Sequence, residues 1–89
     1  RKHVSDLPSD VEATLSQLLA EAATAARSRD RETLDAVMES VETVTTNKVP
    51  AGDLKERLRH GCRRVERLAA DEPLVAAAYC DAMRRRIED

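Results

Sequence analysis

Apolar residues recur every three or four positions along most of this 89-residue chain, with polar residues between them. This spacing matches the period of an α-helix that buries one face. Four stretches carry the pattern and predict helices at about 10–27, 31–46, 54–70 and 73–88. Because the connections between them are short, we expect an all-α fold, a small four-helix bundle made of two antiparallel helical hairpins.

Each predicted helix has an apolar stripe that should face the core. In the first three helices the stripes are Val11, Leu15, Leu18, Leu19, Ala22, Ala23 and Ala26; then Leu34, Val37, Met38, Val41 and Val44; then Leu54, Leu58, Cys62, Val65, Leu68 and Ala69. In the fourth helix the predicted arc is Val75, Ala78, Tyr79, Ala82 and Met83, with Leu74 and Ile87 at its margins. Gly61 lies close to the stripe of the third helix, where we expect a close helix crossing or a mild kink.

Capping residues predict where the helices begin and end. Ser9 with Glu12, and Asp53 with Glu56, have the spacing of a capping box, and Asp30 is placed to cap the second helix. Asn47 is a candidate left-handed terminator of that helix, whose β-branched end at 41–46 leaves a short strand as an alternative. We expect a flexible lead-in at 1–8 and a single helical domain at 9–89.

Two charged stripes of opposite sign have the same helical spacing. The acidic stripe, on the second predicted helix, consists of Glu32, Asp35, Glu39 and Glu42. The basic face, on the third, consists of Arg57, His60, Arg64 and Arg67, with Arg63 beside them, and Arg84, Arg85 and Arg86 close the fourth helix. Such stripes are typical of solvated surfaces, and basic residues in a last turn also complement the helix dipole. The alternative is that the basic residues bind an anionic partner.

The overall charge argues against a general nucleic-acid binder, because the formal net charge is −2. Charge is nevertheless unevenly distributed: residues 1–45 hold five bases against nine acids, whereas residues 46–70 hold seven bases against three acids. The core must consist of Leu, Val and Ala, since Tyr79 is the only aromatic residue. A core of small side chains buries little area per residue, so we expect modest stability.

The chain offers little catalytic or metal-binding chemistry. Glycine-rich phosphate loops, CxxC and HExxH motifs are absent, so we expect no enzymatic activity, no small-molecule substrate and no cofactor. His3, His60, Cys62 and Cys80 lack the spacing of a zinc site, and we expect no metal. An antiparallel hairpin would place Cys62 and Cys80 at the same height, as neighbouring buried thiols or as a reversible disulfide.

We therefore expect a non-enzymatic helical module for protein–protein interaction or self-association, in which the acidic stripe of one copy meets the basic face of another. The alternative is an accessory nucleic-acid-binding protein that uses the basic face. No apolar run reaches the roughly 18 residues of a membrane span, so we expect a cytoplasmic protein without membrane contact.

Overall fold

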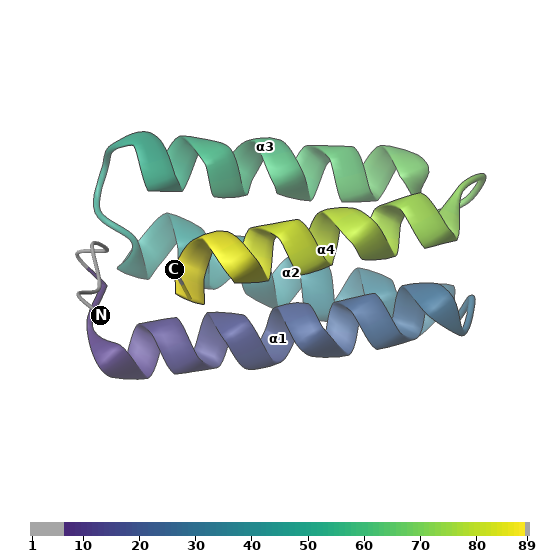
Figure 1. The fold of residues 1–89 in the computed structure, drawn as a ribbon, viewed down its shortest axis with the longest axis horizontal. Helices are drawn as coiled ribbons and strands as arrows, with labels where there is room; N and C mark the ends of the chain where they lie inside the picture. Colours follow the sequence, from purple (N-terminus) through teal and green to yellow (C-terminus); the bar gives the residue numbers. More distant parts are fainter. Residues whose placement is uncertain (1–6, 89) are drawn as a thin grey trace.

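The computed structural model describes residues 7–88, which form four α-helices and no strand. Helix α1 spans Ser9–Arg27, α2 Arg31–Lys48, α3 Asp53–Leu68 and α4 Pro73–Glu88. Successive helices run antiparallel, and the contacts join α1 to α2, α2 to α3, α3 to α4 and α4 back to α1 (Figure 1). The predicted all-α four-helix bundle is confirmed. Within the described part, none of the helices is long and apolar enough to cross a membrane.

The two predicted capping boxes are wrong, because each predicted cap residue is already the first residue of its helix. Ser9 and Asp53 are the first helical residues, and the N-cap positions belong to Pro8 and Gly52, which have no side-chain acceptor. Gly52 has φ of +150°, a conformation that L side chains rarely adopt, so glycine is needed there. Asp53 instead accepts a hydrogen bond from Arg57 at 2.9 Å.

The third predicted cap is confirmed. Asp30 caps α2 by accepting a hydrogen bond from the backbone N–H of Thr33 at 3.2 Å. Hydrogen bonds from the side chain and the backbone of Thr33 hold the pKa of Asp30 below its usual value. The turn that precedes this cap uses Arg29 in the left-handed conformation, with φ of 57°, where glycine would be usual.

Other predicted boundaries move by two residues. Helix α2 continues through Asn47 to Lys48, so Asn47 does not terminate it, and the strand alternative at 41–46 is wrong. Helix α3 ends at Leu68 rather than at residue 70. The Nζ of Lys55 donates to the Thr46 carbonyl at 3.0 Å, which ties α3 to the end of α2.

The lead-in expected at 1–8 lies mostly outside the described residues. Its last two residues are described: Leu7 packs against the core and Pro8 caps α1.

The core follows the predicted stripes of α1, α2 and α3. Its largest fully buried apolar side chains are Leu15, Leu19, Leu34, Val41, Leu58, Val65 and Ile87. Thr45 is also buried, and its hydroxyl has no hydrogen-bond partner among the described residues. The sequence missed Thr45 because threonine is usually exposed.

The predicted arc of α4 is wrong for Val75, Ala78 and Ala82, whereas Met83 is buried and Tyr79 packs against the core. This helix buries Pro73, Ala76, Ala77, Cys80, Met83 and Ile87, and leaves Val75, Ala78 and Ala82 exposed. At about 100° per residue, the buried face is rotated by roughly a third of a turn from the predicted one. The first half of α4 is apolar on nearly every side, so its periodicity does not fix the rotation. Ala76 and Ala77 lie inward, where their small side chains allow α4 to approach its neighbours closely, whereas Ala78 and Ala82 lie outward.

Truncation of central core residues should destabilise the bundle. We expect Leu58→Ala and Val41→Ala each to lower the free energy of unfolding by on the order of 1 to 4 kcal/mol, because a small domain cannot fill the resulting cavity. Urea denaturation followed by circular dichroism measures this change. Glu39→Gln, on the exposed face of α2, is the control, and losses no larger than its own would contradict the described core.

Candidate functional site

Helix α3 carries most of the predicted basic face toward solvent. Arg57, His60, Arg63 and Arg67 are exposed, and Arg64 is half-buried. Their position follows from the other side of the helix, where Leu58, Cys62 and Val65 are buried in the core. The structure therefore separates an apolar face from a cationic face on one helix.

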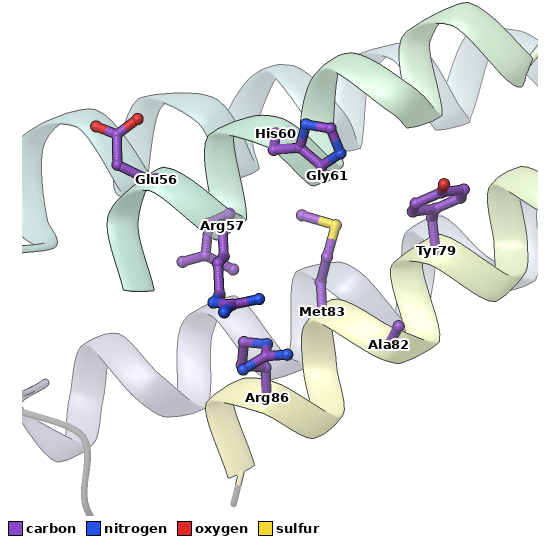
Figure 2. A pocket seen from close by; sticks show the side chains of 9 residues that line it. Glu56, Arg57, His60, Gly61, Tyr79, Ala82, Met83 and Arg86 are labelled. Atoms are coloured by element: carbon purple, nitrogen blue, oxygen red, sulfur yellow. The ribbon is translucent and has the colours of Figure 1, made fainter. Parts of the chain in front are cut away.

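A groove of about 420 Å³ lies between α3 and α4. Its lining residues are Glu56, Arg57, Leu58, His60, Gly61, Tyr79, Ala82, Met83 and Arg86. Figure 2 shows Arg57 and His60 coming from α3, and Arg86, Met83 and Tyr79 from α4. The groove thus combines an apolar floor with three basic side chains, and Glu56 is the one carboxylate in its lining.

The absence of a side chain at Gly61 allows Met83 of α4 to pack against α3 at the floor of the groove. A Cβ atom at this position would lie 2.5 Å from the Sδ and 2.8 Å from the Cγ of Met83, which is closer than real Cβ contacts. Met83 points from α4 toward Gly61 and fills the space that a side chain would take (Figure 2). The close packing expected at Gly61 is therefore a contact with the Met83 side chain, and this contact forms part of the floor of the groove.

Arg64 and Tyr79 link the two helices beside the groove. The Nε of Arg64 donates a hydrogen bond to the Tyr79 hydroxyl at 3.3 Å, and its guanidinium carbon lies 5.6 Å from the ring centroid. This is the geometry of a cation–π contact, which fixes Arg64 against the protein. Arg64 therefore helps to hold the groove together instead of being free to meet a ligand.

Arg57 remains available to a ligand although it has a partner. Its Nε donates to Asp53 one turn earlier at 2.9 Å, and both side chains are more than half exposed. Such a surface pair contributes only a few tenths of a kcal/mol, so a better-placed carboxylate could replace Asp53.

The basic triplet of α4 divides into three environments. Arg84 lies 3.9 Å from Asp81 and 4.0 Å from Glu88, and is half-buried. Arg86 lines the groove, and Arg85 is exposed outside it. Arg63 and Arg67 also lie outside the groove lining. The structure therefore brings together Arg57, His60 and Arg86 from the predicted basic set.

The acidic stripe borders a different groove, between α2 and α3. Asp35, Glu39 and Glu42 line it together with Glu66, whereas the exposed Glu32 is outside the lining. Arg31 donates to Asp35 at 2.9 Å. The grooves on the two flanks of α3 therefore have opposite charge, one mainly basic and the other mainly acidic.

Sequence reasoning missed the apolar groove residues of α4. The predicted core arc included Tyr79, Ala82 and Met83; Met83 is buried as predicted, but the groove that these three residues help to line was not predicted. The signal that could have found the groove was Gly61, because a glycine beside an apolar stripe marks a place where another helix comes close.

Cys62 and Cys80 are buried free thiols, 3% and 0% exposed. Burial is the largest cause that raises the pKa of each to about 12, and for Cys62 the nearby charge of Glu42 adds to it. The neighbouring-thiol interpretation fits this state, since no disulfide joins them. Among residues 7–88, no group of three or more His, Cys, Asp or Glu side chains could hold a metal ion. His3 lies outside the described residues.

The raised thiol pKa values predict a loss of stability at alkaline pH. Below the ordinary thiol pKa, both thiols are protonated in the folded and the unfolded chain. As the pH rises from about 9 toward 12, the unfolded chain ionises first and is favoured, so the free energy of unfolding falls. Urea titrations across this range should show a shallower fall for Cys62→Ala/Cys80→Ala than for the unchanged chain. Parallel falls would contradict the burial of the thiols.

Comparison with curated proteins found no match, and no solved structure matches the chain. A family described as a domain of unknown function (DUF8101) matches residues 1–89, which is the full length of the chain. The chain therefore belongs to this family of domains of unknown function, DUF8101.

Proposed function

We propose that this protein is a non-enzymatic helical interaction module whose α3–α4 groove binds an acidic amphipathic helix of a protein partner. The observation that carries the proposal is the composition of the groove: an apolar floor built by Leu58, Gly61 and Met83, with basic side chains at its edge. An apolar floor attracts apolar side chains, and the basic edge selects carboxylates that flank them.

A helix suits the shape of the site. The groove lies between two helices, and an amphipathic helix can place side chains at i, i+4 and i+7 along such a groove. Arg57, on α3, and Arg86, on α4, would then contact acidic residues on the two sides of the apolar anchors. The space is small, so we expect micromolar affinity.

Nucleic acid is the alternative partner, and the groove supports it less well. Arg64 is held by Tyr79, Arg84 by Asp81 and Glu88, and the lining includes the carboxylate of Glu56. A phosphate backbone gains little from an apolar floor, and the net charge of −2 opposes its approach.

A peptide-display selection tests this proposal. A library of 18-residue helical peptides is selected against the full chain, and the selected peptides are measured by fluorescence anisotropy. We expect peptides that combine Glu or Asp with Leu, Ile or Phe anchors, and at least tenfold weaker binding by Arg57→Glu/Arg86→Glu.

Arg59→Glu/Arg63→Glu is the matched control, because it changes the charge equally at exposed positions of α3 outside the groove lining. It should retain most of the affinity. Selected peptides without an acidic bias, or equal loss in the two double variants, would overturn the proposal. A 20-base-pair DNA duplex is tested in parallel, and binding that only Arg57→Glu/Arg86→Glu removes would favour nucleic acid.

A further inference from the structure

The outward face of α4 exposes large apolar side chains to solvent. Leu74 and Val75 are 60% and 40% exposed, and they are the large hydrophobic side chains that the described residues leave exposed. Ala78 and Ala82 are exposed on the same helix. This surface exists because α4 buries its opposite face, with Ala76, Ala77 and Cys80 in the core.

Leu74, Ala78 and Ala82 are spaced four residues apart, so they form one row along α4. A charged residue lies near each end of the row: Asp71 in the turn just before α4 begins at Pro73, and Arg85 on α4, three residues after Ala82. Both are exposed, and neither takes part in an ion pair among residues 7–88. Ala78 is the midpoint of this arrangement.

We infer that two copies of this chain associate through an antiparallel pair of α4 helices, with the two-fold axis at Ala78. In this register Leu74 packs against Ala82 of the partner subunit, and the turn that carries Asp71 lies near Arg85 of the partner subunit. The two-fold axis forms each contact twice. The large Leu74 thus meets a small alanine, and both exposed charges gain a partner.

Charge and side-chain size select this arrangement over the alternatives. A parallel pair would place Asp71 opposite Asp71 and Arg85 opposite Arg85, which is unfavourable. The small Ala78 at the axis lets the two helices approach closely.

Pairing of the acidic stripe of α2 with the basic face of α3 would also match charges. The outward side of α2 nevertheless exposes no large hydrophobic residue within the described chain, so that contact would bury little apolar area.

The α4 face differs from the groove of the proposed function. Ala82 borders both surfaces, but Arg57, His60 and Gly61 belong to the groove alone. Dimerisation does not depend on ligand binding in the groove. An experiment can therefore contradict one of the two proposals and leave the other standing. One helix pair buries less than the roughly 1,600 Å² of a standard stable interface, so we expect a weak, micromolar dimer.

Sedimentation equilibrium of the full chain, from 10 μM to 1 mM, tests the inference. The average mass should rise from the monomer value of 9.9 kDa toward twice that value. Leu74→Glu should keep the protein monomeric, while circular dichroism confirms that the helices are intact. Arg57→Glu, which removes a groove cation, should leave the dimer unchanged.

A charge exchange tests the register. Asp71→Arg and Arg85→Asp should each weaken the dimer at least tenfold, because each creates two like-charge contacts. Asp71→Arg/Arg85→Asp restores opposite charges across the axis and should return the dissociation constant to within about threefold of the original. A monomer at 1 mM, a dimer insensitive to Leu74→Glu, or no recovery in the double variant would each overturn the inference.

Discussion

The packing of α4 through its small side chains is the constraint on which the rest of the structure depends. The chain has one aromatic residue, Tyr79, and it does not fill the core. The core of the bundle is instead filled because the helices pack closely against one another: Ala76 and Ala77 lie inward, and Gly61 leaves room for Met83. Small residues lose less conformational entropy on burial, but they also bury less area. Helix α4 makes its most extensive contact with α1, which contributes its own alanines, and Arg27 pairs with Asp81 across that contact.

The rotation of α4 about its own axis determines both candidate binding surfaces, the α3–α4 groove and the outward face of α4. With Ala76 and Ala77 inside, Met83 points toward Gly61 and Arg86 comes to the edge of the groove that Arg57 also lines. The same rotation places Leu74 in solvent. Burial of the predicted arc instead would turn Ala76 and Ala77 toward solvent and bring Val75, Ala78 and Ala82 into the core. The residues that α4 buries in the core therefore also determine which of its residues form the two candidate binding surfaces.

The sequence predicted most of the fold because three of the four helices are strongly two-faced. In α3, for example, Leu58 and Val65 alternate with arginines at helical spacing, so one rotation is favoured. Helix α4 lacks that contrast, because apolar residues lie on both of its faces: the predicted arc held Ala78 and Ala82, whereas the helix buries Ala76 and Ala77. The groove could be predicted only in part for the same reason. Arg57 and His60 were found from their spacing, whereas the contributions of Met83 and Arg86 depend on how α4 is rotated.

The rotation of α4 can be measured directly by the reactivity of single cysteines. In a Cys62→Ala/Cys80→Ala background, one cysteine is introduced at each α4 position, and its reaction with a maleimide is timed in dilute solution. We expect fast reaction at positions 74, 78 and 82 and slow reaction at 76, 77 and 83, in line with their exposure. Fast reaction at 76 and 77, with protection at 75, 78 and 82, would show that α4 buries the face predicted from its sequence, and would contradict the rotation of α4 in the structure.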